Sequence, residues 1–195
     1  MGSGPRNDRG TRAPISELLA PHRSDPPPKS AAGAAVTIVL RSGRDDLEVL
    51  LIERTTREDD PASGQIALPG GHVDPRDADL GATAVRELEE EVGLSLSDLV
   101  PPIRFVGLEP SRRFEMTIGV FAAELAPHSP TPTRGSPTEV AHVFWLPRRA
   151  VDATERVLRD TSAGPIEVDA TVYEGHVLWG FTRRVLRRFL GLERP

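Results

Sequence analysis

The residues from 80 to 92 constrain the fold more than any other part of the chain. Ala84, Leu88 and Val92 recur at intervals of four, a spacing that places their side chains on one face of an α-helix. Gly93 follows directly, and glycine readily takes the left-handed backbone conformation that ends many helices. The sequence therefore predicts an amphipathic helix over residues 80–92 that buries one stripe against the rest of the protein.

Short apolar segments on both sides of this helix predict a β-sheet. Residues 34–40 and 47–52 are rich in β-branched side chains and flank a polar, turn-like stretch, so we expect them to form a hairpin. Ile66-Ala67-Leu68 predicts a shorter strand, which must end at Pro69-Gly70-Gly71 because these residues favour a turn. Further strands are expected over residues 103–108, 117–124 and 140–146.

The two ends of the chain differ in character. Residues 1–32 are rich in Gly, Pro, Ser and Arg, and Pro26-Pro27-Pro28 cannot enter a helix interior. We expect a flexible N-terminal arm over residues 1–32, with at most one helical turn at residues 15–19, followed by a single domain over residues 33–195. Apolar residues at helical spacing predict a closing amphipathic helix over residues 177–192.

The composition excludes several classes of protein. The chain has no cysteine, which excludes disulfides, thiolate metal sites and cysteine nucleophiles. Its net charge of −5 argues against a protein that coats nucleic acid, since phosphate contacts require a concentrated basic surface. No apolar run reaches the roughly 18 residues of a membrane span, and no basic segment precedes an apolar one near the start. We therefore expect a cytoplasmic protein that acts neither on nucleic acid nor at a membrane.

A second face of the predicted helix carries Glu87, Glu90 and Glu91. Carboxylates this close repel one another, and a bound Mg²⁺ or Mn²⁺ would remove that cost because hard cations prefer oxygen ligands. A Glu-rich stripe alone is more typical of a solvated helix face. The context favours a metal site, since Gly71 lets a backbone carbonyl approach an ion and Arg86 is placed to hold an acid in one rotamer.

These residues resemble the sequence box of the Nudix hydrolase superfamily. The second half of the box matches at every position, over Arg86-Glu87-Leu88-Glu89-Glu90-Glu91-Val92-Gly93-Leu94. The resemblance implies an α/β fold, the Nudix α/β/α sandwich around a mixed β-sheet. It also implies metal-dependent hydrolysis of a diphosphate linkage in a small-molecule substrate, with Mg²⁺ or Mn²⁺ as cofactor. A homodimer is compatible with the resemblance.

The first half of the box departs from the family pattern. The usual spacing would place a glycine at His72 and a glutamate at Ala78, and neither residue is present. A one-residue insertion restores the register, with Asp77 or Asp79 in place of the missing glutamate. The resemblance implies that this acid supports the structure and does not bind the metal.

The resemblance also implies the role of each residue in the box. Glu90 and Glu91 correspond to ligands of the catalytic metals, and Glu87 corresponds either to a further ligand or to the group that orients the water. The carbonyl of Gly71 is the corresponding backbone ligand. Arg86 corresponds to a structural partner of the acids.

Other candidate residues lie outside the box. Family members commonly recruit another acid from a loop before a late strand, and Glu139 corresponds to that position. Glu115 is the rival candidate, and a plain loop carboxylate is the alternative interpretation of Glu139. Arg54, Arg112 and Arg113 are candidates to meet substrate phosphates, although an arginine-rich chain also carries arginines that are simply solvated.

Three further segments are similar to the coenzyme A diphosphatase group, namely residues 50–55, 64–77 and 175–182. This similarity implies coenzyme A or acyl-CoA as the substrate, cleaved to 3',5'-ADP and phosphopantetheine. Where the group carries a basic stretch, this chain has Glu58-Asp59-Asp60, which disfavours a ligand with an additional phosphate. ADP-ribose or a nucleotide sugar is the alternative substrate, and a Nudix module that senses a nucleotide without cleaving it is the alternative class.

Overall fold

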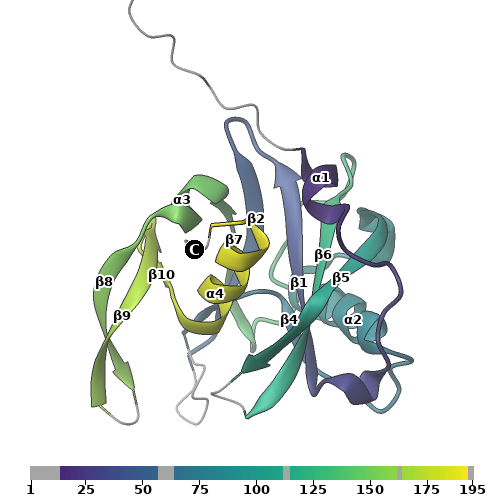
Figure 1. Ribbon diagram of the computed structural model, residues 1–195, viewed down its shortest axis with the longest axis horizontal. Helices are drawn as coiled ribbons and strands as arrows, with labels where there is room; N and C mark the ends of the chain where they lie inside the picture. The colour runs from purple at the N-terminus through teal and green to yellow at the C-terminus, as the bar shows by residue number, and fades with distance from the viewer. Residues whose placement is uncertain (1–13, 57–63, 112–114, 162–163, 193–195) are drawn as a thin grey trace, which may run out of the picture.

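The computed structural model describes residues 14–56, 64–111, 115–161 and 164–192 (Figure 1). A seven-stranded sheet forms its centre, with the path β3-β2-β1-β6-β5, while β4 also pairs with β1 and β7 with β2. Strand β1 runs parallel to β6, and its pairing with β2 is antiparallel, so the predicted hairpin and mixed sheet are confirmed. The strands of this sheet are β1 (Ala34–Ser42), β2 (Leu47–Arg54), β3 (Ile66–Ala67), β4 (Gly70–His72), β5 (Leu99–Ser111), β6 (Met116–Leu125) and β7 (Val140–Pro147).

Helices cover both faces of this sheet, as Figure 1 shows. Side chains alternate along β1, so that Val39 packs with Leu88 on one face while Ile38 and Leu40 pack with Leu186 on the other. The first face belongs to α2 (Leu80–Val92), and the second to α1 (Ile15–Leu19), α3 (Arg148–Asp152) and α4 (Gly180–Phe189). The arrangement confirms the predicted α/β/α sandwich. No helix in the described ranges is long and apolar enough to cross a membrane.

Helix α2 has the boundaries that the sequence predicts. The carboxylate of Asp79 accepts a hydrogen bond of 2.9 Å from the backbone N–H of Ala82 and caps the first turn. Gly93 ends the helix with φ of 70°, and its N–H donates to the carbonyl of Glu89 at 3.1 Å. Both ends of the helix are therefore fixed by local interactions.

The segment from residue 14 to 32 packs on the sheet, so the prediction of a flexible arm is wrong for this part of the chain. Helix α1 buries Ile15 and Leu19 in the core. The proline run then crosses the start of α2, where the carbonyl of Pro27 accepts a hydrogen bond of 3.2 Å from the N–H of Leu80. Proline supplies carbonyl acceptors without needing donors of its own, which suits an extended segment lying on a helix. The rest of the expected arm lies outside the described residues.

The C-terminal region begins with strands that the sequence analysis did not predict. Strands β8 (Glu155–Thr161), β9 (Gly164–Tyr173) and β10 (His176–Leu178) form a separate sheet in the order β10-β9-β8 (Figure 1). The predicted helix over residues 177–192 is therefore wrong at its start, because Val177 and Leu178 pair with β9. Gly180, with φ of 64°, separates β10 from the body of α4.

Candidate active site on helix α2

Glu91 is the buried member of the acid stripe on α2. Its side chain leaves the helix toward β4, and Oε2 accepts a hydrogen bond of 2.8 Å from the N–H of Gly70. Only 3% of the residue is exposed. Burial raises the pKa of Glu91 to about 8, and the nearby charge of Glu87 raises it as well, while the Gly70 N–H acts in the opposite direction. A positive charge at this place would therefore stabilise the ionised form of Glu91.

Strand β4 approaches α2 closely because it contains two adjacent glycines. A Cβ atom on Gly70 would overlap the carbonyl oxygen of Ala35, and its φ of 150° is one that L side chains rarely adopt. A Cβ on Gly71 would lie 2.6 Å from the carboxylate carbon and both carboxylate oxygens of Glu87. The space beside Gly71 is thus occupied by that carboxylate.

Arg86 links the acid stripe to the segment that precedes the helix. Its Nη1 donates to Glu87 Oε1 at 2.7 Å and to Glu90 Oε2 at 3.2 Å. Its Nη2 donates to the carbonyl of His72 at 2.9 Å and to Asp77 Oδ2 at 3.0 Å, while Nε donates to Asp77 Oδ1 at 3.1 Å. The guanidinium therefore holds two glutamates in place and neutralises part of their charge.

The structure distinguishes the two candidates for the accessory acid. Asp79 is the helix cap, whereas Asp77 pairs with Arg86 and also accepts hydrogen bonds from the Thr83 hydroxyl at 2.8 Å and the Asp74 N–H at 2.9 Å. These bonds hold the pKa of Asp77 well below its usual range, chiefly through the Arg86 guanidinium. Asp77 thus occupies the supporting position that the sequence left open.

The end of β2 and the start of β7 bring two further charged groups to the stripe. The carbonyl of Glu139 accepts a hydrogen bond of 2.8 Å from the N–H of Thr55. The negative charge of Glu139 raises the pKa of both Glu87 and Glu91, and the positive charge of Arg54 lowers that of Glu91. These side chains are therefore within electrostatic reach of one another.

Several predicted residues lie elsewhere. Glu115 is exposed in the turn between β5 and β6, with φ of 49°. Arg112 and Arg113, together with the acidic residues 58–60, lie outside the described residues.

Sequence reasoning missed an aromatic cluster next to Arg54 on the opposite face of the sheet. The ring of His176 stacks on Phe144, with centroids 4.1 Å apart and an interplanar angle of 10°, and His142 lies 5.6 Å away. His176 Nδ1 is also 3.3 Å from Glu53 Oε2. The cluster joins the small C-terminal sheet to β2. It could not be predicted from the sequence, because its members come from segments that are far apart in the chain.

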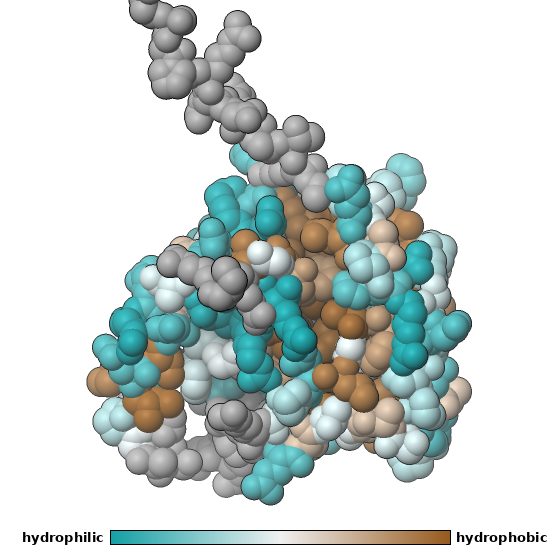
Figure 2. All heavy atoms as spheres, viewed as in Figure 1, coloured by the Kyte–Doolittle hydropathy of each residue, from teal (hydrophilic) through white to brown (hydrophobic). Residues whose placement is uncertain are grey.

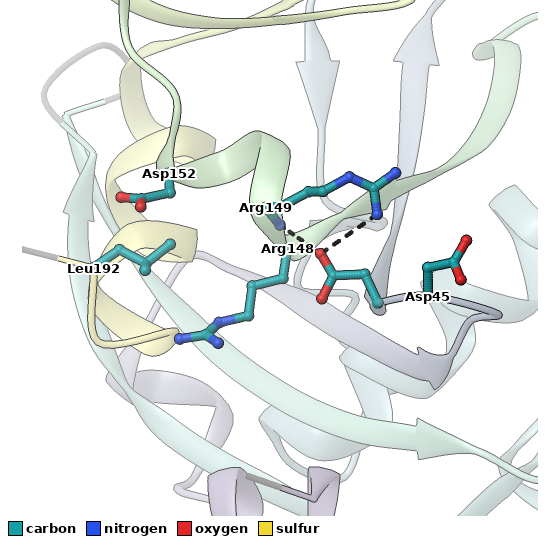
Figure 3. Close-up of a pocket in the computed structure, with 6 residues that line it drawn as sticks. Asp45, Arg148, Arg149, Asp152 and Leu192 are labelled. Carbon is teal, nitrogen blue, oxygen red and sulfur yellow. Dashed lines mark hydrogen bonds and ion pairs between the residues drawn. The ribbon is translucent and has the colours of Figure 1, made fainter. Parts of the chain in front are cut away.

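Two cavities lie away from the acid stripe. One, of about 260 Å³, lies between α3, the β1–β2 turn and Leu192 (Figure 3). There the Asp46 carboxylate accepts a hydrogen bond of 2.7 Å from the backbone N–H of Arg149, and the Arg149 guanidinium lies 3.9 Å from the same oxygen. The other, of about 300 Å³, lies between α4 and β5, and its lining includes the ion pair of Arg188 and Glu109 at 2.7 Å. Figure 2 shows apolar atoms exposed among polar ones on this face.

The donor set on α2 fits a divalent cation. Carboxylate oxygens and a backbone carbonyl are the ligands that Mg²⁺ and Mn²⁺ prefer, and the raised pKa of Glu91 shows where a positive charge would be stabilising. Within the described ranges, no three acids or histidines already surround one point. The Arg86 guanidinium contacts both Glu87 and Glu90.

Comparison with solved structures shows which class of fold this is. A MutT/nudix family protein from Enterococcus faecalis superposes with a TM-score of 0.54 at 19% identity, over 89% of this chain and 67% of that one. The MutT protein from Methanosarcina mazei Go1 superposes with a TM-score of 0.54 at 18% identity, over 80% and 90%. The sandwich of helices around this mixed sheet is the Nudix fold.

The chain belongs to the Nudix family, because residues 31–164 match the family model described as NUDIX domain. "Nudix hydrolase 22, chloroplastic" of Arabidopsis thaliana is 33% identical over 194 residues, covering 91% of this chain and 59% of the relative. "Uncharacterized Nudix hydrolase NudL" of Yersinia enterocolitica is 31% identical over 144 residues, covering 71% of each. "Nudix hydrolase 15, mitochondrial" of Arabidopsis thaliana is 32% identical, and the chain spans 66% of its length. This chain therefore spans less than two thirds of either plant relative.

Proposed function

We propose that the protein is a hydrolase that cleaves a diphosphate linkage in a nucleoside diphosphate derivative with the help of Mg²⁺ or Mn²⁺. The observation that carries the proposal is Glu91, a carboxyl group buried between Gly70 and Glu87 whose ionised form requires additional positive charge. A buried acid with a raised pKa in a cluster of acids is typical of a functional site. Nudix hydrolases, the enzymes of the family to which the chain belongs, generally use divalent metal ions.

In this proposal each group at the site has a defined task. Metal ions, when bound, neutralise phosphate charge and favour a water nucleophile. They would be held by Glu87, Glu90 and Glu91 together with the carbonyl of Gly71 and the carboxylate of Glu139. Arg86 orients the acids through the hydrogen bonds described above. The proposed partners of the substrate phosphates are Arg54, Arg112 and Arg113.

For the substrate, we propose coenzyme A or acyl-CoA, cleaved by water to 3',5'-ADP and phosphopantetheine. Support comes from the residues that resemble the coenzyme A diphosphatase group: residues 64–77 lead directly into the helix of the acid stripe, while residues 175–182 lie on the opposite face of the sheet. Residues 64–77 form β3, β4 and the Asp77 segment, and residues 175–182 run through β10 into α4. His176 from the second segment lies 3.3 Å from Glu53, the neighbour of Arg54.

One observation favours a different substrate. Three consecutive acids at residues 58–60 disfavour the 3'-phosphate that distinguishes coenzyme A from ADP-ribose and nucleotide sugars. ADP-ribose or a nucleotide sugar is therefore the second candidate.

The test is analysis of the products formed from coenzyme A, ADP-ribose, a nucleotide sugar, dinucleotides and nucleoside triphosphates, each with Mg²⁺ and with Mn²⁺. We expect 3',5'-ADP from coenzyme A, and loss of turnover by at least about 100-fold in Glu90→Gln, the scale reported for a metal ligand or its direct support. Glu89→Gln is the matched control, because Glu89 is an exposed neighbour on the same helix.

Three other outcomes have distinct meanings. Cleavage of ADP-ribose alone would select the second substrate. Tight binding of one nucleotide without product would select a sensing module. Equal turnover by wild-type protein and Glu90→Gln would show that the acid stripe is not the catalytic site.

A further inference from the structure

The loop that carries Glu139 is fastened to the end of α2. The last carbonyls of a helix have no donor within the helix, and two of them are satisfied here by this loop. The N–H of Gly135 donates to the carbonyl of Glu91 at 3.0 Å, and the N–H of Thr133 donates to the carbonyl of Val92 at 3.1 Å. The loop thus contacts the backbone of a residue whose side chain belongs to the acid stripe.

Gly135 lies so close to α2 that no larger residue fits. A Cβ atom there would overlap the carbonyl oxygen of Glu90 and would lie 3.3 Å from the carbonyl carbon of Glu91. Both obstacles are helix backbone, which cannot rotate away as a flexible side chain can. Gly135 is not among the glycines with positive φ, so close approach and not backbone conformation requires a glycine here.

A short, hydrogen-bonded turn connects this contact to Glu139. The carbonyl of Ser136 accepts the N–H of Glu139 at 3.0 Å and that of Val140 at 2.8 Å. On the far side, Thr55 donates its N–H to the carbonyl of Glu139 at 2.8 Å and its hydroxyl to the carbonyl of Pro137 at 3.3 Å. The loop acid is therefore held between α2 and the end of β2.

We propose that Gly135 is a positioning residue that sets the separation between Glu139 and the two acids Glu87 and Glu91. The electrostatic influence of Glu139 on both acids depends on that separation. A side chain at position 135 pushes the loop off α2 and takes Glu139 with it. The inference rests on the proposed role of Glu139 as a further acid at a metal site.

The test compares Gly135→Ala with Gly107→Ala. A Cβ on Gly107, in β5, meets nothing within 4 Å, so this variant controls for the general effect of replacing a glycine by alanine. Mn²⁺ binding is measured by electron paramagnetic resonance on the folded protein, together with Tm, kcat and KM. We expect Gly135→Ala to weaken Mn²⁺ binding about 10-fold or more, as is common for residues that orient metal ligands, and to lower kcat with KM nearly unchanged. Gly107→Ala should match the wild type.

A double-mutant cycle separates positioning from a general loss of structure. If Gly135 acts through Glu139, then Gly135→Ala has little further effect on Mn²⁺ binding in a Glu139→Gln background. Independent effects of the two substitutions, or Mn²⁺ binding by Gly135→Ala equal to that of Gly107→Ala, would overturn the inference.

A second variant covers the case in which Gly135→Ala does not fold. One glycine inserted after Pro137 leaves the contact with α2 intact but lengthens the connection to Glu139, and we expect a similar loss of Mn²⁺ affinity. An insertion without effect contradicts the inference. Failure of the proposed function would give a different result, because the wild-type protein itself would then neither bind Mn²⁺ nor cleave any diphosphate. In that case the inference about Gly135 would fail together with the proposed function.

Discussion

Asp77 and Arg86 are joined by two parallel hydrogen bonds, of 3.1 Å from Nε to Oδ1 and 3.0 Å from Nη2 to Oδ2. The aspartate side chain is 6% exposed and that of the arginine 25%. Since the same guanidinium also contacts Glu87 and Glu90, the ion pair anchors the acid stripe to the segment before the helix. All three guanidinium nitrogens of Arg86 therefore donate hydrogen bonds to acceptors within the protein.

Asp77→Asn should lower the free energy of unfolding by about 2 kcal/mol, because it removes the charge from the paired hydrogen bonds with Arg86 while the contacts of Arg86 with Glu87 and Glu90 remain. Urea denaturation at pH 7 measures this change. Asp74→Asn is the control, since Asp74 pairs with an Arg76 side chain that is 84% exposed, and ion pairs at the surface contribute little to stability.

The same substitution has a defined pH dependence. The folded-state pKa of Asp77 is lowered, so its ionised form stabilises the protein above its unfolded pKa of about 4, and this contribution is lost as the pH falls through the folded-state value. The difference in stability between wild type and Asp77→Asn should therefore shrink below about pH 4. A constant difference from pH 7 to pH 3 would contradict the assignment.

The sequence could predict Glu87, Glu90 and Glu91 as one stripe because helical spacing is local information. It could not choose between Asp77 and Asp79, because the choice depends on how the chain enters the helix. The attachment of Gly135 to α2 has no local pattern at all, since it joins residues more than forty positions apart. A glycine within a Pro-, Ser- and Thr-rich loop looks like an ordinary loop residue in the sequence, because its close contact with α2 is visible only in the fold.

The errors at the two ends of the chain have similar causes. Residues 15–19 form the helical turn that the sequence allows, but so short a segment has no pattern that shows Ile15 and Leu19 packing in the core. Strands β8 and β9 expose most of both faces, so the alternation of apolar and polar residues that marks a half-buried strand is weak. The homodimer and the domain boundary between residues 32 and 33 remain predictions.

Thr37 and Thr83 should respond in opposite ways to replacement by valine. Both are fully buried. The Thr37 hydroxyl has no hydrogen-bond partner in the described part of the structure, whereas that of Thr83 donates to Asp77 at 2.8 Å. Thr37→Val should stabilise the protein by about 1 kcal/mol, because it removes an unsatisfied polar group, and Thr83→Val should destabilise it by about 1–2 kcal/mol. Equal effects in urea denaturation would show that the Thr37 hydroxyl is satisfied in solution.

Glu91→Gln should change how the stability of the metal-free protein depends on pH. Because the folded-state pKa of Glu91 is raised to about 8, the folded protein binds more protons than the unfolded chain between about pH 4.5 and pH 8. Protonated Glu91 therefore stabilises the folded protein. This contribution is complete below the unfolded pKa and is lost as the pH rises through this interval. The wild type should therefore lose stability from pH 5 to pH 8 relative to Glu91→Gln, whose amide still accepts the Gly70 N–H. Thermal denaturation in the presence of a chelator measures the difference, and parallel pH profiles would contradict it.

Addition of Mn²⁺ should stabilise the wild type more than Glu91→Gln. A ligand that binds only the folded state raises its stability in proportion to the logarithm of the ligand concentration over Kd. At pH 8 we expect Mn²⁺ to raise the Tm of the wild type by several degrees and that of Glu91→Gln by much less. Glu89→Gln, the exposed neighbour, should follow the wild type.

Arg54→Gln distinguishes two roles of Arg54, namely contact with the substrate phosphates, which the sequence predicts, and stabilisation of the ionised form of Glu91. Its charge lowers the pKa of Glu91, so its removal should shift the pH midpoint of Mn²⁺ binding upward. Arg41→Gln is the control, since the Arg41 guanidinium lies 4.0 Å from the Trp145 ring centroid and pairs with Glu48 at 2.7 Å. If Arg54 serves only the substrate phosphates, KM rises while the midpoint stays fixed. A shift of the midpoint shows that the same residue helps to ionise the buried acid before any substrate arrives.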